Sequence, residues 1–297
     1  MTSPAARDPR PRRSLLPLGF ILPGLIFYVL FLVWPAVQAL WISLTDWDGL
    51  SEQQNFVGLE NYQRMLDDPV VGTAAVNNVL WTLVTIALPM ALGLALAVLL
   101  NRKARSSPFF RTLFYAPAVL PLVSIASIWA WLYDPTDGAI NELLRMVGLG
   151  DLAQSWLGQD STALWAVMVA AVWVRTGFPM LLYLAALQSI PDELYEAAAL
   201  DGANRWQRFT QITFPSLKDT HYVVLALSLI ESLKVFDLIY AMTYGGPGYA
   251  TQVMGTWMYA NVFQYFDAGY GTAIAVVITI VAVAVGTPFV RSQVRNS

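Results

Sequence analysis

Four ionisable residues interrupt long apolar stretches of the chain. Arg175 lies near the middle of one apolar run, and Glu231, Lys234 and Asp237 recur at every third position of another. At about 100° per residue, these three cover about 120° of one helix face. A charge at mid-membrane depth costs about 3 kcal/mol, so such side chains face a protein interior and find partners there. The pattern is compatible with a polar solute pathway and with a structural ion-pair network.

A second polar set offers groups that could bind a sugar. Asn78, Trp81, Thr82 and Thr85 share one face of an expected helix, and Tyr183 lies farther along the chain. An indole ring gives a stacking surface for a sugar ring, while amide and hydroxyl groups give hydrogen bonds. The alternative is that Trp81 belongs to the aromatic belt at a membrane interface.

Cysteine and histidine, which serve as nucleophiles, bases and metal ligands, are almost absent from the chain. It has no Cys and a single His, His221, which is expected at the membrane interface. No G-x-S-x-G or H-E-x-x-H motif occurs. An intramembrane enzyme would need a nucleophile with a base, or a set of metal ligands. The sequence therefore predicts no catalytic residue, no metal site and no enzyme activity.

The composition indicates the environment that positions these residues. Of 297 residues, 57% are hydrophobic and 12% are charged, and the mean hydropathy is +0.53. An ordinary soluble domain carries about 25% charged residues. The composition excludes a disordered chain, a basic nucleic-acid-binding domain and most cytosolic enzymes.

Six apolar runs reach the length of about 20 residues that a spanning helix needs. They cover about 18–42, 78–100, 112–133, 162–188, 222–243 and 272–290. The first run is too long for a signal peptide, and no small-x-small cleavage site follows it. The sequence predicts an all-α integral membrane protein, with a transmembrane domain over 15–297 after a basic segment over 1–14.

The distribution of Lys and Arg predicts the orientation. Only Arg64 and Arg145 lie in the first, third and fifth connections. Thirteen basic residues lie at the termini and in the second and fourth connections: Arg7, Arg10, Arg12, Arg13, Arg102, Lys103, Arg105, Arg111, Arg205, Arg208, Lys218, Arg291 and Arg295. Because basic residues favour the cytoplasmic side, both termini are expected in the cytoplasm.

The fourth connection, 189–219, carries a helix–turn–helix pattern. Ser189 is a candidate cap for a helix that Gly202 stops, and a second short helix is expected over 204–213, ended by Pro215. Small alanines on one face allow another surface to approach closely. The pattern fits an amphipathic hairpin on the membrane surface and a docking element for a cytoplasmic partner.

A family resemblance favours docking. Glu196-Ala197-Ala198-x-x-Asp201-Gly202-Ala203, followed by Phe209, Ile212 and Pro215, resembles the EAA loop of inner-membrane permeases of binding-protein-dependent ABC importers. Ile190-Pro191-x-Glu193-Leu194-Tyr195 is similar to the sugar-uptake branch, the maltose and glycerol-phosphate permease type. Two further stretches resemble that branch: Phe236-Asp237-Leu238-Ile239-Tyr240 before Gly245-Gly246-Pro247-Gly248, and Tyr115-Ala116-Pro117 with Trp129-x-Trp131-Leu132-Tyr133.

The resemblance implies a six-helix type I ABC importer permease bundle in a bacterial inner membrane, forming the pathway for a sugar or sugar-like solute. It implies that an extracytoplasmic binding protein delivers the solute, that a second permease subunit completes the pathway, and that two cytoplasmic ATPase subunits drive it; no nucleic acid is involved. The implied ATPase-coupling residues are Glu196, Ala197, Ala198, Asp201, Gly202, Ala203, Phe209 and Pro215. The chain lacks G-x-x-x-x-G-K-[ST], so ATP and Mg²⁺ are expected on the partner ATPase and no cofactor on this chain.

The alternative is a secondary transporter driven by an ion gradient. That class often contains inverted repeats, and no clear repeat relates the two halves of this sequence. An EAA loop also has no role in such a transporter.

Overall fold

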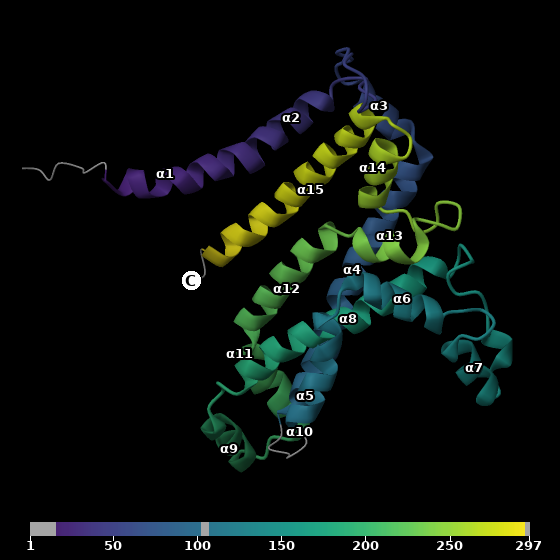
Figure 1. Cartoon of the computed structure of the whole chain (residues 1–297). Coiled ribbons are helices and arrows are strands. Elements are labelled where there is room, and N and C mark those ends of the chain that lie inside the picture. Colours follow the sequence, from purple (N-terminus) through teal and green to yellow (C-terminus); the bar gives the residue numbers. More distant parts are fainter. Residues whose placement is uncertain (1–15, 102–106, 295–297) are drawn as a thin grey trace, which may run out of the picture.

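The computed structural model describes residues 16–101 and 107–294. This part of the chain is helical with connecting segments and has no β-strand, apart from an isolated bridge between Thr45 and Phe56. Figure 1 shows long helices with short helices at their ends. The predicted all-α class is confirmed. Segment 1–14 and the predicted cytoplasmic residues Arg102, Lys103, Arg105 and Arg295 lie outside the described residues.

The first predicted span extends away from the remaining helices. It consists of α1 (Leu16–Tyr28), a π-helical turn η1 (Val29–Val33) and α2 (Trp34–Ile42). The large apolar side chains between Ile21 and Trp41 are exposed. Only α2 has substantial contact with the rest of the described bundle, through α15. Figure 1 shows α1 projecting from the molecule.

The second span begins earlier than the hydropathy pattern predicts. Helix α3 (Glu60–Asp67) is followed directly by α4 (Pro69–Leu100). The Asp68 carboxylate accepts a hydrogen bond from the Val70 N–H at 2.8 Å, and Pro69 occupies the first helical position. Both features stabilise a helix start, so α4 extends beyond the predicted 78–100.

The third predicted span is sharply bent. Helix α5 (Ser107–Tyr115) and the 3₁₀ turn η2 (Ala116–Val119) meet α6 (Leu122–Leu132) at 101°. Leu120 and Pro121 between them have extended backbones, with ψ of 144° and 135°. Proline disfavours helical geometry in the residue before it, which explains the break.

The fourth span follows the prediction closely, after a third connection that contains two short helical elements. The connection contains α7 (Ala139–Met146) and the 3₁₀ turn η3 (Gly150–Leu152). The fourth span is α8 (Ala163–Leu187), within one residue of the expected 162–188 at each end. Helix α8 is the most deeply buried of the candidate spans, since 61% of its most apolar window is buried.

The fourth connection forms two short helical units. Helix α9 (Asp192–Leu200) ends before Gly202, whose φ is +80°. Helix α10 (Arg205–Arg208) follows, then a π-helical turn η4 (Phe209–Thr213) and α11 (Phe214–Ser216). Pro191 precedes the first helix, and the Ser189 hydroxyl donates to the Ala186 carbonyl instead of capping α9.

The fifth predicted span, 222–243, is not one helix. Helix α12 (Lys218–Leu233) stops, and α13 (Asp237–Thr243) starts after an irregular segment at 234–236. Val235, Leu238 and Ile239 are buried against Trp81. Irregular backbone at membrane depth is tolerated where protein covers it or where it lines a cavity, and both conditions hold here.

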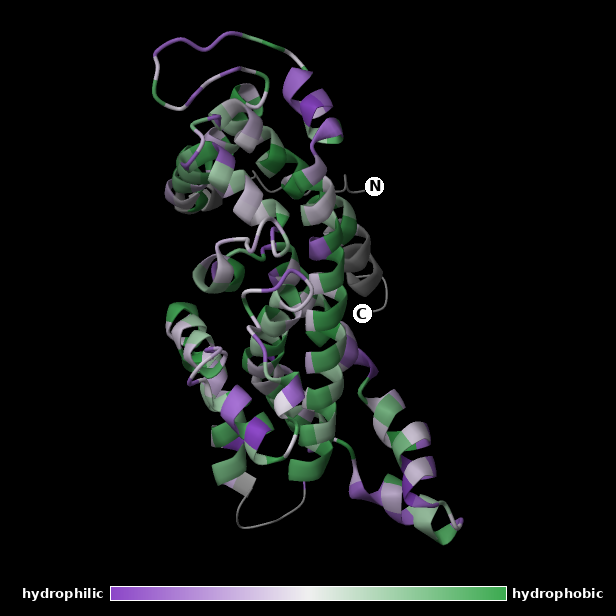
Figure 2. Ribbon diagram, turned by 90° about the vertical axis from the view of Figure 1, so that its right-hand side faces the viewer, coloured by the Kyte–Doolittle hydropathy of each residue, from purple (hydrophilic) through white to green (hydrophobic). Residues whose placement is uncertain are grey.

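The chain continues through α14 (Met254–Phe263) into α15 (Ala268–Val294). Within the described residues, four helices are long and apolar enough to cross a membrane, or five if the bent third span is included. The fifth of the six predicted spans is present only as two separate helices, α12 and α13. Figure 2 shows hydrophobic residues along the long helices and hydrophilic residues gathered in the loops and short helices at the ends.

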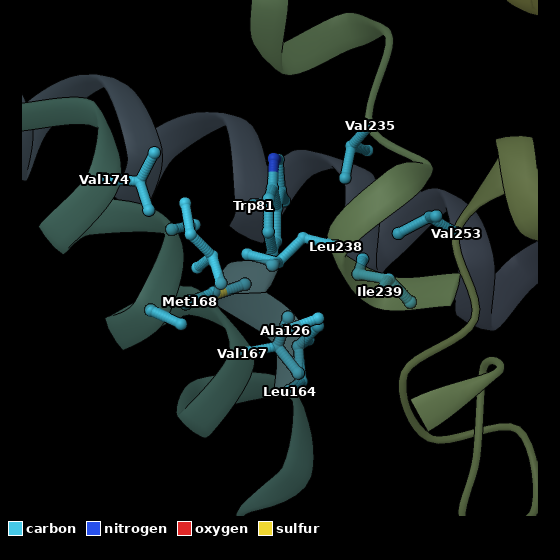
Figure 3. Packing of buried hydrophobic residues seen from close by; sticks show 13 residues of the cluster. Trp81, Ala126, Leu164, Val167, Met168, Val174, Val235, Leu238, Ile239 and Val253 are labelled. Atoms are coloured by element: carbon cyan, nitrogen blue, oxygen red, sulfur yellow. The ribbon is translucent and has the colours of Figure 1, made fainter. Parts of the chain in front are cut away.

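Close packing between α4 and α8 forms the centre of the bundle. Gly93 of α4 lies against Pro179 of α8, where an added Cβ would come within 2.8 Å of the Pro179 Cβ. Buried side chains gather on both sides of this crossing. Figure 3 shows one such cluster, in which Trp81 stands between Val174 of α8 and Val235 at the break after α12.

Candidate functional site

A cavity of about 160 Å³ lies where α4, α8 and the α12–α13 break meet. Five of the seven residues predicted for the solute pathway line it: Trp81, Arg175, Glu231, Lys234 and Asp237. The break brings Lys234 and Asp237 to the same wall as Glu231. The structure therefore gathers residues from three elements that are more than 50 residues apart in the chain.

Arg175 shares the cavity with two acids without forming an ion pair. Its Nη2 atom donates to the main-chain oxygen of Glu231 at 3.5 Å. In the described part of the chain, ion pairs occur only between Arg64 and Asp267 and between Arg145 and Glu142. The cavity is therefore lined by separate charges of both signs, and a closed network of side-chain pairs is not formed.

Trp81 adds a hydrogen-bond donor to the same site. Its side chain is 1% exposed, and its indole Nε1 atom has no hydrogen-bond partner. Buried polar atoms are nearly always hydrogen-bonded, so an unpaired donor needs an explanation. The indole N–H is available to an acceptor that enters the cavity.

Asn78, a sixth predicted pathway residue, has a different environment. Its side-chain oxygen accepts a hydrogen bond from the Met254 N–H at 2.8 Å, at the start of α14. The neighbouring Asn77 donates to the carbonyl groups of Ala250 and Gln252. Asn78 borders a separate, mainly apolar groove between α4, α12 and α15. These contacts hold the connection before α14, and Asn78 does not reach the charged cavity.

Tyr183, the seventh candidate, lies at the far end of α8. It is 1% exposed, and its hydroxyl is 2.9 Å from Nδ1 of His221. It therefore belongs to the contact between α8 and the first turn of α12, next to the fourth connection. The sequence predicted His221 at the membrane interface. It did not predict the contact with Tyr183, because the two residues are 38 positions apart in the chain.

A group of stacked aromatic rings next to the cavity was missed. Phe236 lines the cavity and stacks on Tyr240, with ring centroids 5.0 Å apart. Tyr259 of α14 contacts both rings, at 5.4 and 5.0 Å. The sequence signal was the family-like stretch from Phe236 to Tyr240, which did not include Tyr259 because that residue comes from another helix.

The eight predicted coupling residues lie on the α9–α11 segment. Glu196, Ala197, Asp201 and Gly202 are exposed, and Ala198 and Ala203 are half-buried. Among the described helices, α9 has no extensive contact with any other. A Cβ placed on Gly202 would meet nothing within 4 Å. The segment presents a free helix and a turn to its surroundings.

The second half of this segment is held more firmly. The Asn204 side chain accepts a hydrogen bond from the Gln207 N–H, and the Gln207 side chain accepts one from the Asn204 N–H. This reciprocal cap fixes the start of α10. Phe209 stacks on Trp206, and its ring also contacts Phe214, beside Pro215.

Comparison with known proteins identifies the family. Residues 80–295 match the family described as binding-protein-dependent transport system inner membrane component. The chain is 39% identical over 275 residues to the probable ABC transporter permease protein YurN of Bacillus subtilis, covering 92% of this chain and 94% of that protein. It is 36% identical over 265 residues to the trehalose/maltose transport system permease protein MalF of Thermococcus litoralis, covering 89% of each.

Two further comparisons agree. The alpha-glucoside transport system permease protein AglF of Rhizobium meliloti is 38% identical over 300 residues, which covers 99% of this chain and 87% of AglF. A chain in the crystal structure of a bacterial ABC transporter that imports the acidic polysaccharide alginate superposes with a TM-score of 0.81 at 25% identity, covering 95% of this chain and 96% of that one. These relatives are transport components and not enzymes. The chain therefore belongs to the family of inner-membrane components of binding-protein-dependent transport systems, and its fold is that of an ABC importer permease.

Proposed function

We propose that this chain forms half of the pathway through which an ABC importer moves a sugar or sugar-like solute across a bacterial inner membrane. The observation that carries the proposal is the cavity at Trp81, with charged groups and the ring of Phe236 in its wall. Charged groups and an indole N–H can bind hydroxyls, and aromatic faces pack against the apolar faces of sugar rings. Relatives named for trehalose/maltose and alpha-glucoside transport support the same class of solute.

A second permease subunit completes the pathway. Glu231, Lys234 and Asp237 remain exposed beside apolar helices. Leaving such groups against lipid costs about 3 kcal/mol each, so charged residues at this depth face protein or water. A second permease placed against this side would cover them and enclose the solute.

Two cytoplasmic ATPase subunits supply the energy. Helix α9 and the Gly202 turn offer small, exposed residues at which a groove of another protein can approach closely. ATP and Mg²⁺ are bound by those subunits, because this chain has no phosphate-binding loop. An extracytoplasmic binding protein delivers the solute. Nucleotide and solute then bias one equilibrium between inward-facing and outward-facing bundles.

Reconstitution tests the proposal. Proteoliposomes would contain this chain with the second permease and the ATPases, and the binding protein with a panel of labelled sugars would be outside. We expect uptake of one class of sugar with ATP inside, and none with a non-hydrolysable ATP analogue. Uptake that persists without ATP hydrolysis and follows an imposed ion gradient would identify a secondary transporter instead.

A further inference from the structure

The single histidine of the chain joins the fourth connection to the bundle. His221 lies on the first turn of α12, which follows the α9–α11 segment. Its Nδ1 atom is 2.9 Å from the Tyr183 hydroxyl on α8, and its Nε2 atom is 3.3 Å from the Phe214 carbonyl oxygen. One imidazole therefore bridges a spanning helix and the end of the connection.

The hydrogen-bond partners define the tautomer of this bridge. A carbonyl oxygen can only accept, so Nε2 of His221 carries the proton and donates to Phe214. In the neutral ring Nδ1 is then an acceptor, and the Tyr183 hydroxyl donates to it. Both ring nitrogens and the buried Tyr183 hydroxyl are satisfied by this one arrangement.

The bridge extends to the exposed part of the connection. The ring of Phe214 packs on His221, with centroids 4.5 Å apart, and contacts Phe209 at 6.2 Å. The Tyr195 hydroxyl on α9 is 3.0 Å from the Thr213 hydroxyl, which immediately precedes Phe214. A series of direct contacts thus runs from α9 to α8.

The contact on α8 is buried. Tyr183 packs in a buried cluster with Leu217 and Val224, which are 0% and 1% exposed. Arg175 of the cavity lies eight residues earlier on α8, a separation of about 12 Å at 1.5 Å per residue, and Pro179 between them packs against Gly93 of α4. Because α8 remains helical through Pro179 and this proline is buried against α4, we expect displacement of the Tyr183 end to reach the Arg175 end.

We propose that Tyr183 and His221 are positioning residues that transmit movement of α9 to α8, and so to the cavity. The inference rests on the proposed function, in which α9 docks to an ATPase. Removing the hydrogen bond between Tyr183 and His221 would still allow α9 to dock to the ATPase. The movement of α9 would then be transmitted less effectively to α8. The expected signature is ATP hydrolysis that no longer moves solute efficiently.

The test uses Tyr183→Phe, which removes one hydroxyl and retains the ring. In proteoliposomes with the second permease, the ATPases and the binding protein, uptake and ATP hydrolysis would be measured together. We expect the solute moved per ATP to fall about tenfold, as expected for loss of one buried hydrogen bond that leaves its partner unpaired. The control is Tyr222→Phe. Tyr222 follows His221 in the chain and is more exposed than Tyr183, so this variant should match the wild type.

A double-mutant cycle separates transmission from stability. If both residues act through their mutual bond, Tyr183→Phe combined with His221→Ala should be no worse than His221→Ala alone. If Tyr183→Phe moved as much solute per ATP hydrolysed as the wild type, the inference would be overturned. So would a fall in uptake and hydrolysis in equal proportion with a lower unfolding temperature, which is the result for a merely structural contact. Failure of the proposed function would be distinguishable, because wild-type uptake would then not require ATP.

Discussion

The indole nitrogen of Trp81 is a buried donor without a partner among the described residues, and its residue lines the cavity together with the charged groups. We expect Trp81→Phe to raise the solute concentration for half-maximal uptake about two- to tenfold, since a neutral hydrogen bond contributes about 0.5–1.5 kcal/mol. The phenyl ring retains most of the packing, so the amount of protein in the membrane should change little. Uptake kinetics over a range of solute concentrations would measure the effect.

Trp129 provides a matched control. Its Nε1 atom is also buried without a partner, and its ring packs against the same cluster, but it does not line the cavity. Trp129→Phe should leave the half-saturating concentration unchanged. Equal effects in both variants would show that the Trp81 donor has no special role in solute binding.

Asp68 lies between α3 and α4 and connects the start of α4 to α14 and α15. Its Oδ2 atom accepts hydrogen bonds from the Tyr270 hydroxyl at 2.6 Å and from the Trp257 indole at 2.9 Å. Burial alone would raise the pKa of Asp68, but hydrogen bonds from Tyr270, Trp257 and the Val70 N–H outweigh it and lower the pKa below its ordinary 3.8. The charged carboxylate therefore stabilises the folded state.

The sign of this shift gives a pH dependence. The stabilisation is present above the unfolded pKa, near 3.8, and is lost as the pH falls through the lower folded value. We expect Asp68→Asn to unfold at a lower temperature than the wild type at pH 7. The difference should shrink below about pH 4, measured by tryptophan fluorescence in detergent. A difference that is constant down to pH 2.5 would contradict this assignment.

At the scale of helices, the close contact between α4 and α8 requires a glycine at position 93. A Cβ on Gly93 would lie 2.8 Å from the Pro179 Cβ and 2.9 Å from the Met180 nitrogen. We expect Gly93→Val to separate the two helices and lower stability by about 1–3 kcal/mol, as in other overpacked cores. The measurement is the unfolding temperature of the purified protein.

Gly72 lies on the same helix and controls for helix propensity. A Cβ there would meet nothing within 4 Å, so Gly72→Val should change the unfolding temperature little. Comparable losses at the two positions would mean that close approach of α4 and α8 does not limit stability.

The helices differ in how far their sequences specify them. Helix α8 could be predicted to within one residue, because a long apolar run with a single charged residue, Arg175, is bounded by polar residues at both ends. The break after α12 could not, since 234–236 contain neither Gly nor Pro. It is stabilised from outside by burial of Val235 against Trp81 and by Gly255, where a Cβ would lie 2.8 Å from the Val235 carbonyl oxygen.

The same limit applies to the site. The spacing of Glu231, Lys234 and Asp237 predicted a shared face of one helix. Helix α12 instead ends at Leu233 and α13 begins at Asp237, and the break between them brings the three residues to one cavity. Asn78 and Tyr183 were separated from this group by their own partners, Met254 and His221, which are 176 and 38 residues away. Hydrogen bonds over such distances leave no local pattern in a single sequence.

For the whole molecule, the uneven distribution of Lys and Arg predicts the orientation in the membrane. Reporter fusions at Asp151, within η3 of the third connection, and at Ser297 should locate to opposite sides, with Ser297 in the cytoplasm. A reporter that is active only in the cytoplasm and one that is active only outside it would be compared at each site. Both fusions reporting the same side would contradict the topology.

The most direct test of an ATPase-driven importer is a comparison of two glycines. Gly202 in the α9–α10 turn and Gly148 after α7 both have φ of +80° and open space around the Cβ position. Valine should therefore cost each turn about the same, on the order of 1–2 kcal/mol. Each variant would be purified from membranes together with its ATPase, and the amount of ATPase per permease would be measured. We expect Gly202→Val to lose the ATPase and ATP-dependent uptake while Gly148→Val retains both; full ATPase association in Gly202→Val would contradict coupling through this loop.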